Sequence, residues 1–314
     1  MKRHYKIAFC GMGSIGRRHF RNTIKYLLEH DCSYQIDVIR SGKGKKLDED
    51  FEKYISEQYS DKETISPDYD VIFITNPTSM HWDSILKYQN CTRSMFIEKP
   101  VTDNMENYTG DLRQELICYV ACPLRYSRVL QYVKKNIALD KVYSVRAICS
   151  TYLPGWHLGE DYRESYSAHK DMGGGVAIDL IHEWDYLTWL FGRPKHVIRI
   201  CRKVSELEID SEDLAVYLGY TDNRIYELHL DYFGRYEIRE MELYLPKQTV
   251  HVDILNGMLR SSDQEVAVCL REERDEYQMR EISHFFDIVN GVCENDNDIK
   301  EAVKTLRLAK GLED

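Results

Sequence analysis

The sequence has no long hydrophobic run. No apolar stretch approaches the roughly 18 residues that a membrane-spanning helix needs. The N-terminus passes from "MKRH" into the short "YKIAFC", which is too brief for the apolar core of a secretory signal. The nine cysteines are odd in number and include no CxxC pair, which argues against a disulfide framework and a structural zinc site. We therefore expect a cytoplasmic protein with free thiols, no membrane segment and no metal.

Positive charge is also in short supply. The 42 Lys and Arg residues against 52 Asp and Glu residues give a formal net charge of -10, whereas nucleic-acid binding needs clustered cations to meet phosphates. Internal repeats and low-complexity segments are absent as well. What is present, 314 residues of which 43% are hydrophobic and 30% charged, is typical of a globular protein long enough for two domains.

A glycine-rich turn lies between a predicted strand and a predicted helix near the N-terminus. The run "YKIAFCG" has the composition of a buried strand, and from residue 14 the apolar residues recur at helical spacing. In this context the pattern G-x-G-x-x-G predicts a dinucleotide pyrophosphate site, because the glycines allow a tight turn, close approach of the phosphates and packing of helix on strand. Free N–H groups of the helix N-terminus would bind the phosphates. A glycine turn of some other α/β protein is the alternative. The expected contacts are Gly11, Met12, Gly13, Ser14, Ile15 and Gly16.

The second predicted strand, "YQIDVIR", is expected to end beside the adenosine ribose. NAD-specific proteins usually carry an acidic residue there, but Asp37 lies inside the strand, which runs out into Arg40, Ser41 and Lys43. A guanidinium and a hydroxyl suit a 2′-phosphate better than a 2′-hydroxyl. These residues therefore favour NADP(H) over NAD(H), with a solvated basic loop as the alternative.

Two further predicted strands end in polar residues. "DYDVIFITNP" and "SMFIEKPV" are near-continuous apolar runs, and the first leads into a helix. Ligands of doubly wound sheets bind past the carboxyl ends of the strands. A lysine at such a strand end is seldom there for packing, so Lys99 is expected to face the same crevice as the glycine turn. The cofactor contacts predicted here are Thr75, Asn76, Pro77, His81, Glu98 and Lys99.

Four segments together resemble one family. "AFCGMGSIGRRH", "DVIFITNPTSMH", "FIEKP" and "DMGGGVAIDLIHEWDYLTWLFG" stand in the order and at roughly the separations found in the glucose-fructose oxidoreductase/inositol dehydrogenase/rhizopine catabolism (Gfo/Idh/MocA) family. The resemblance covers nearly the whole chain. It implies a Rossmann domain over residues 1–123 and an α/β domain over residues 124–314, whose last helix can pack back on the first domain.

The same resemblance implies an activity. Members mostly oxidise or reduce a hydroxyl or keto carbon of a sugar, cyclitol or sugar nucleotide with NAD(P). The lysine of the Glu-Lys-Pro segment, here Lys99, typically contacts both the nicotinamide and the substrate hydroxyl. The open, mostly antiparallel sheet of the second domain often mediates dimer or tetramer formation.

The segment from residue 154 to residue 191 supplies most candidate substrate contacts. Its first part has few aliphatic residues, which is typical of a loop that meets a polar ligand; a surface loop is the alternative. The apolar positions from 176 to 191 predict one helix on which Asp179 and His182 share a face. His182 could then take a hydroxyl proton while a carboxylate orients its ring, and a structural histidine is the alternative. The expected substrate contacts are Arg125, Trp156, Tyr162, Arg163, Tyr166, Asp179 and His182, and the catalytic residues are Lys99, His182 and Asp179.

The sequence departs from the family pattern in three places. Aspartate and histidine stand three apart in "DLIHEWDY", where most relatives space them by four. This resembles a side branch with an "HExDY" helix that is often associated with bacterial surface-polysaccharide sugars, and it leaves open whether Asp179 or Asp185 partners His182. The segment between Pro100 and Cys122 is short, so a trimmed helix is expected there. Cys122 stands where many relatives have asparagine.

The last third of the chain alternates as an antiparallel sheet. The runs "HVIRICRKV", "DLAVYLGYT", "RIYELHLDYF", "YEIREMELYLP" and "QTVHVDIL" have two unlike faces, of which one should pack on helices and the other could meet a second subunit. "REISHFFDIVNGV" and "DIKEAVKTLRLAKGL" are amphipathic helices. The predicted fold is α/β, with an N-terminal doubly wound parallel sheet and an open, mostly antiparallel sheet in a homodimer or homotetramer.

The combined prediction is an NAD(P)-dependent dehydrogenase or reductase acting on CH–OH groups of a carbohydrate. In oxidation, His182 removes the hydroxyl proton as hydride leaves the same carbon for the nicotinamide, and Lys99 stabilises the developing negative charge. Two alternatives stay open. One is a regulatory or sensor protein that binds NADP(H) without chemistry, and the other is a reductase of a non-sugar carbonyl.

Overall fold

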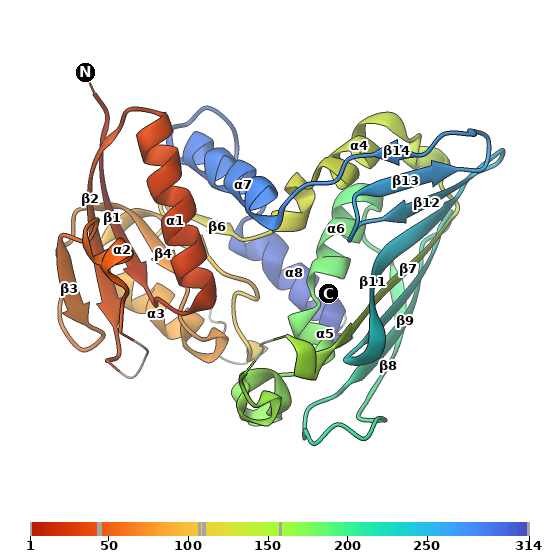
Figure 1. Ribbon diagram of the computed structural model, residues 1–314, viewed down its shortest axis with the longest axis horizontal. Coiled ribbons are helices and arrows are strands. Elements are labelled where there is room, and N and C mark those ends of the chain that lie inside the picture. The colour runs from red at the N-terminus through yellow and green to blue at the C-terminus, as the bar shows by residue number, and fades with distance from the viewer. Residues whose placement is uncertain (1, 43–45, 106–107, 109–110, 157–158, 313–314) are drawn as a thin grey trace. The chain divides into compact units, whose positions relative to one another are not determined.

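The computed structural model describes residues 2–42, 46–105, 108, 111–156 and 159–312, in two compact units. Unit 1 comprises Met1–Ala121 and Arg274–Ala302, and unit 2 comprises Cys122–Glu273 and Val303–Asp314 (Figure 1). The contacts thus group Arg274–Ala302 with unit 1, whereas the predicted division assigned that segment to the second domain. A single cut along the sequence does not describe this grouping, because the chain returns to unit 1 after completing most of unit 2.

Unit 1 is built on a parallel sheet of six strands in the order β3-β2-β1-β4-β5-β6. The order reverses between β1 and β4, which is the switch point where doubly wound sheets bind ligands at their carboxyl ends. This sheet confirms the predicted Rossmann architecture. Its strands are β1 (His4–Cys10), β2 (Ser33–Arg40), β3 (Glu57–Ser60), β4 (Tyr69–Ile74), β5 (Thr92–Ile97) and β6 (Ile117–Val120).

Helices cover both faces of this sheet, which is why β1, β4 and β5 each end in an apolar run. Phe9 of β1 packs on Phe20 of α1 at 5.1 Å between ring centroids, while its neighbour Cys10 contacts Ser84 of α3. The helix α7 packs beside α1 (Figure 1). No α-helix is present among the described residues between Pro100 and β6. The helices of unit 1 are α1 (Ser14–Glu29), α2 (Glu49–Glu52), α3 (His81–Tyr88) and α7 (Arg274–Val289), and α8 (Ile299–Lys310) begins in it.

Unit 2 contains an eight-stranded sheet in the order β14-β13-β12-β11-β7-β10-β9-β8. Its pairs are antiparallel except for β10 with β7, which are parallel, so the predicted mostly antiparallel sheet is confirmed. The strands are β7 (Ser144–Tyr152), β8 (His196–Arg202), β9 (Leu214–Tyr220), β10 (Ile225–Asp231), β11 (Phe233–Tyr244), β12 (Thr249–Asp253), β13 (Met258–Ser261) and β14 (Val268–Cys269).

The two faces of this sheet differ as the alternation predicts. On β10, Tyr226 and Leu228 are buried, whereas Ile225 and Glu227 are exposed. The buried face packs on helices, with Trp184 in edge contact with a tyrosine of β9. The helices of unit 2 are α4 (Arg128–Asn136), α5 (Val176–Asp179) and α6 (His182–Phe191), together with the part of α8 from Val303 onward.

The single helix predicted from residue 176 to residue 191 is wrong. The chain forms α5, leaves helical geometry at Leu180 with φ -95° and ψ 28°, and starts α6 at His182. The residues across the break are nearly all apolar and buried, so the hydrophobic pattern carried no sign of a change in direction. Asp179 therefore ends one helix and His182 begins the next, and their three-residue spacing does not place them on one helical face.

Within the described residues, no helix is both long and apolar enough to cross a membrane. All nine cysteines are free thiols.

Candidate functional site

The glycine turn of unit 1 is held by its own backbone packing. Gly11 has φ +97°, and a Cβ there would lie 2.5 Å from the backbone nitrogen of Asn76. A Cβ on Gly16 would lie 2.4 Å from the carbonyl oxygen of Gly11, which also accepts a 2.7 Å hydrogen bond from the Thr75 hydroxyl. A Cβ on Gly13, by contrast, would meet no atom of the described residues within 4 Å. Gly11 and Gly16 are therefore required by the turn itself, whereas the space in front of Gly13 is open, as a bound phosphate group requires.

The N-terminus of α1 has the features that suit a helix terminus to an anion. Its N-cap is Gly13, no side chain caps it, and its first turn contains no acidic residue. The first N–H groups and the positive end of the helix dipole are therefore left to an anionic ligand. Ser14 is exposed, Ile15 is half-buried, and the carbonyl of the buried Met12 accepts a hydrogen bond from Arg17.

The end of β2 carries no acidic side chain. Asp37 is fully buried inside the strand, where it accepts hydrogen bonds from the Tyr69 hydroxyl (2.7 Å) and from Gln35. Arg40, half-buried, ends the strand, and the exposed Ser41 follows; Lys43 lies outside the described residues. The structure thus ends β2 at Arg40, with Ser41 directly after it, as the sequence analysis expects.

Asn76 and His81 lie at the carboxyl end of β4. The Asn76 amide nitrogen donates to the Ser84 hydroxyl at 2.8 Å, while its buried Oδ1 accepts from no described residue. A buried acceptor without a donor is costly, so this oxygen fits a ligand that brings an N–H group. His81 is buried, with its two ring nitrogens 2.8 Å from the carbonyl oxygens of Asn76 and Pro100. Burial lowers the pKa of His81, while the contacts with the two carbonyl oxygens act in the opposite direction. Pro77, between them, is exposed.

Glu98, at the end of β5, pairs with His19, a residue that was not predicted to belong to the site. Its Oε1 lies 2.5 Å from Nε2 of His19 in α1, and its Oε2 accepts a 3.1 Å hydrogen bond from the Lys99 N–H. Burial raises the pKa of Glu98, but the hydrogen bond and charge of His19 outweigh it and hold that pKa below its usual value. Lys99 is half-buried beside this pair. The helix behind the glycine turn is thus linked directly to the candidate catalytic lysine.

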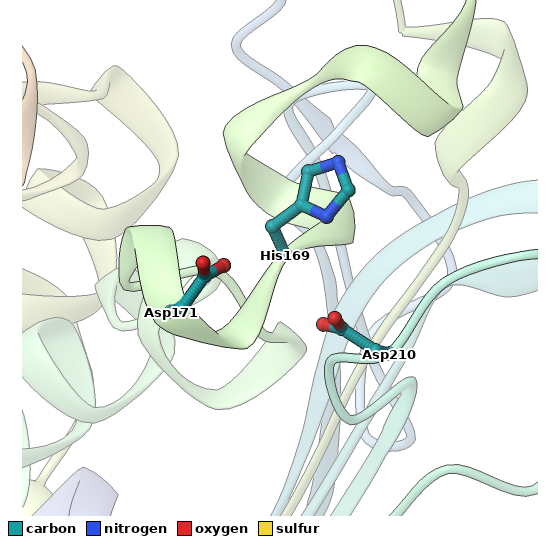
Figure 2. A group of neighbouring side chains, drawn as sticks. All are labelled: His169, Asp171 and Asp210. Carbon is teal, nitrogen blue, oxygen red and sulfur yellow. The ribbon is translucent and has the colours of Figure 1, made fainter.

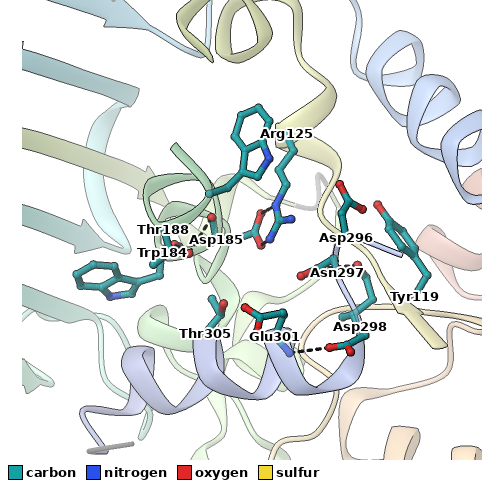
Figure 3. Close-up of polar contacts among 12 residues, drawn as sticks. Tyr119, Arg125, Trp184, Asp185, Thr188, Asp296, Asn297, Asp298, Glu301 and Thr305 are labelled. Carbon is teal, nitrogen blue, oxygen red and sulfur yellow. Dashed lines mark hydrogen bonds and ion pairs between the residues drawn. The ribbon is translucent and has the colours of Figure 1, made fainter. Parts of the chain in front are cut away.

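Arg125 and Asp185 form a buried ion pair in unit 2. The Arg125 guanidinium donates from Nε (3.0 Å) and from a terminal nitrogen (2.6 Å) to the two carboxylate oxygens of Asp185 (Figure 3). The two residues are only 6% and 8% exposed. The pair joins the turn before α4 to the first turn of α6, so Arg125 has a structural role whatever its part in substrate binding, which stays a prediction.

Two further contacts fix the residues around His182. The buried Tyr232 hydroxyl donates to Asp179 at 2.5 Å, and both burial and the Asp179 carboxylate raise the pKa of that tyrosine, which keeps its proton. Glu183, which is fully buried, accepts from Arg239 of β11 at 2.7 Å. His182, half-buried, is the first residue of α6. Glu183, Arg239 and Tyr232 were not predicted; the acidic residue inside the "HExDY" segment was the available signal.

Two aromatic residues of the loop after β7, Trp156 and Tyr166, differ in how far they are packed against other residues. Trp156 donates from its indole nitrogen to the Thr151 hydroxyl at 2.7 Å and stands edge-on to Tyr232. Tyr166 is 48% exposed. Trp156 is therefore part of the packing around Asp179, whereas Tyr166 presents its ring to solvent.

Arg163 and Tyr162 contact the acidic connection between β8 and β9. Arg163 pairs with Asp161 at 2.7 Å and with Glu208 at 3.0 Å, and the Tyr162 hydroxyl accepts from the Glu208 N–H. Both carboxylates and the guanidinium are well exposed. A substrate anion would have to compete with these carboxylates for Arg163, and its role in substrate binding stays a prediction.

The match of this chain to a family of known proteins lies within unit 1. Residues 5–110 match the sequence model of an oxidoreductase family with an NAD-binding Rossmann fold, GFO_IDH_MocA. Among curated proteins, the chain is 24% identical over 199 residues to the scyllo-inositol 2-dehydrogenase (NAD(+)) of Bacillus subtilis (strain 168), a match that covers 61% of this chain and 55% of that protein. The chain thus spans about half the length of this curated relative.

Solved structures extend the likeness to the whole chain. The UDP-N-acetylglucosamine 3-dehydrogenase of Acidithiobacillus ferrooxidans is similar with a TM-score of 0.72 at 18% identity, covering 98% of each chain. A levoglucosan dehydrogenase in complex with NADH and levoglucosan is similar with a TM-score of 0.80 at 13% identity, covering 99% of this chain and 96% of that one. At these identities the likeness shows a shared fold.

Proposed function

Since residues 5–110 belong to the Gfo/Idh/MocA oxidoreductase family with its NAD-binding Rossmann fold, we propose that the protein is a nicotinamide-dinucleotide-dependent dehydrogenase. Its substrate is a sugar, cyclitol or sugar nucleotide that reacts at a hydroxyl-bearing or keto carbon. The names of the relatives above contain substrates of this class. The observation that carries the proposal is the uncapped, acid-free N-terminus of α1 behind the open space at Gly13. Asn76 Oδ1, a buried acceptor without a donor among the described residues, supports it.

The chain's own residues divide the work of the reaction. When bound, the nicotinamide accepts or supplies the hydride. In oxidation, His182 takes the hydroxyl proton on an imidazole nitrogen, and the Lys99 ammonium donates to the same oxygen and offsets its developing negative charge. In reduction each role reverses. Asp179 supports His182 electrostatically while Tyr232 holds its carboxylate.

Two buried ion pairs favour His182 as the proton acceptor. Asp185 and Glu183 lie in the same first turn of α6 as His182, and each is bound to an arginine of another element, Arg125 and Arg239. Fixing the first helical turn fixes the ring that projects from it, and catalysis depends on such positioning. Asp185 is occupied by Arg125 through both oxygens, so we propose Asp179 as the carboxylate that serves His182.

We propose NADP(H) as the preferred dinucleotide. The guanidinium of Arg40 and the hydroxyl of Ser41 follow β2, and the only acid of that strand, Asp37, is held inside it by Tyr69. A guanidinium and a hydroxyl at a strand end suit a ribose 2′-phosphate better than a 2′-hydroxyl, for which a carboxylate is the usual partner.

We also propose that the uncovered face of the unit 2 sheet joins copies of the chain into a dimer or tetramer. Ile198 and Leu218 are register partners on β8 and β9, and Tyr220 pairs with Ile225 of β10. All four side chains are between 41% and 60% exposed. An apolar patch of this kind is typical of an association surface, and Ile198→Glu should lower the mass measured by light scattering.

Turnover by single-residue variants tests the proposed chemistry. The wild type should oxidise or reduce members of a panel of sugars, cyclitols and sugar nucleotides, with surface-polysaccharide sugars of bacteria placed first. Lys99→Ala and His182→Ala should each lower kcat by about 100-fold or more while dinucleotide binding stays within severalfold. The control is Lys25→Ala, which removes an exposed lysine of α1. Unchanged turnover in Lys99→Ala would refute the catalytic assignment.

A further inference from the structure

Three side chains of unit 2 bring metal-ligand atoms together outside the proposed catalytic residues. His169, Asp171 and Asp210 each offer one nitrogen or oxygen, and these atoms lie within 4.8 Å of one another (Figure 2). His169 is half-buried and the two aspartates are exposed. The two aspartates come from separate segments, the turn before the triple glycine and the connection between β8 and β9.

Backbone contacts hold these two segments in register. The Lys170 N–H donates to Asp210 Oδ1 at 2.7 Å, and the Asp210 N–H donates to the Ala168 carbonyl at 3.0 Å. The next residue, Ser211, donates its hydroxyl to the Ser167 carbonyl at 2.6 Å. Ser167, Ala168 and Ser211 are buried. The ligand atoms are therefore carried by a fixed backbone frame, and the second oxygen of Asp210 remains for another partner.

Asp171 and Asp210 differ from several nearby acidic residues in their charged partners. Three other acids of the same connection have a cationic side chain within 4 Å: Glu208 with Arg163, Glu212 with Arg199, and Asp213 with Lys203. Among the described residues, neither Asp171 nor Asp210 has a lysine or arginine partner within that distance. Two carboxylates that approach each other repel, and a cation bound between them would relieve that repulsion.

We propose that His169, Asp171 and Asp210 bind a divalent first-row metal ion. One imidazole and two carboxylates suit ions such as Mn²⁺ or Zn²⁺ better than Ca²⁺, which prefers oxygen ligands alone. Ligands bonded to one such ion at roughly 2.0–2.2 Å lie about 3–3.5 Å apart, so the atoms must close by ~1.8 Å at most. The two aspartates are exposed, so their side chains have room to rotate toward an ion.

The ion would act as a clamp. It would tie the turn that follows Tyr166 and precedes Gly174 to the connection between β8 and β9, and so order the loop that leads into α5. This proposal goes beyond the dehydrogenase function and does not depend on it. It also revises the expectation, drawn from the cysteine pattern, that no metal binds.

Titration with Mn²⁺, followed by loss of the free-ion electron paramagnetic resonance signal, tests the site on full-length protein without a histidine tag. Mn²⁺ is the probe because it avoids the nine free thiols, which would compete for Zn²⁺. We expect one ion per chain. Affinity should fall at least tenfold in His169→Gln and in Asp210→Asn, whose amide oxygen can still accept from the Lys170 N–H and so preserves the frame.

His251→Gln is the matched control, because His251 also pairs with a carboxylate in unit 2, Glu240, at 3.1 Å. It should bind Mn²⁺ as the wild type does. Thermal unfolding should show Mn²⁺ raising the midpoint of the wild type and of His251→Gln but not of Asp210→Asn. Absence of Mn²⁺ binding by the folded wild type would overturn the proposal, as would equal affinity in wild type, His169→Gln and Asp210→Asn.

Discussion

Two glycines of the same turn should fail for different reasons when replaced by alanine. Gly13 has φ -71° and ψ -168°, which alanine adopts without strain, and its added Cβ would meet no described atom within 4 Å. Gly13→Ala should therefore change the free energy of unfolding by no more than about 0.5 kcal/mol. Its methyl group would, however, stand in the space proposed for the pyrophosphate. We expect the Kd for the dinucleotide to rise at least tenfold, which is about 1.4 kcal/mol of binding free energy.

Gly11→Ala provides the contrast. At φ +97° an alanine is strained by roughly 1–2 kcal/mol, and its Cβ would lie 2.5 Å from the Asn76 nitrogen and 2.6 Å from its Cα. These are backbone atoms that cannot rotate away. Gly11→Ala should destabilise unit 1 by about 2 kcal/mol or more and lose binding through misfolding of the turn.

Fluorescence titration with NADPH and NADH, together with urea unfolding of each variant, separates the two effects. Gly155→Ala is the control, because its Cβ would have one neighbour among the described residues, at 4.0 Å, and its φ is not positive. It should leave both measurements unchanged. If Gly13→Ala bound both dinucleotides as tightly as the wild type, the turn would not be a pyrophosphate site.

Three further predictions concern residues around the site. Asp185→Asn should lower the free energy of unfolding by about 3 kcal/mol in urea, because it leaves the buried charge of Arg125 unpaired; a change below 1 kcal/mol would contradict that role. The pKa of Glu98 lies below its usual 4.5, so its stabilisation is present above that pH and is lost as the pH falls through the lowered value. The unfolding free energies of wild type and Glu98→Gln should therefore differ most near neutral pH and converge in acid; a difference that is constant with pH would contradict the depressed pKa. Arg40→Ala should weaken NADPH binding about tenfold and leave NADH binding unchanged, and equal loss for both would remove the basis for NADP(H) preference.

The elements that the sequence predicted share one property, burial that fixes a local pattern. The strands β1, β4 and β5 are almost wholly buried and end in apolar runs, and β10 alternates because one of its faces is exposed. The edge strand β3 was missed because "EQYS" is almost wholly exposed. The break between α5 and α6 was missed because apolar residues continue through it.

In the candidate site, too, the local features were predictable from the sequence and the long-range contacts were not. The glycine turn is local, so spacing alone predicted it. The ion pairs of Glu98 with His19, Asp185 with Arg125, and Glu183 with Arg239 join residues 79, 60 and 56 positions apart. No periodicity in the chain reports which buried charge meets which, because the pairings depend on how strands and helices pack. The structure thereby supplies these supporting residues, and the assignments of Lys99 and His182 to the chemistry stay predictions.

Isotope transfer tests the central claim most directly. The reduced dinucleotide, carrying deuterium at nicotinamide C4, would be incubated with the protein and a panel of keto-sugars and keto-forms of sugar nucleotides, and the products examined by mass spectrometry and nuclear magnetic resonance. A hydride-transferring enzyme places the deuterium on the carbon that bore the carbonyl oxygen, and Lys99→Ala abolishes the transfer. Tight dinucleotide binding with no deuterium in any member of the panel would contradict the account and point to a nucleotide-binding protein without chemistry.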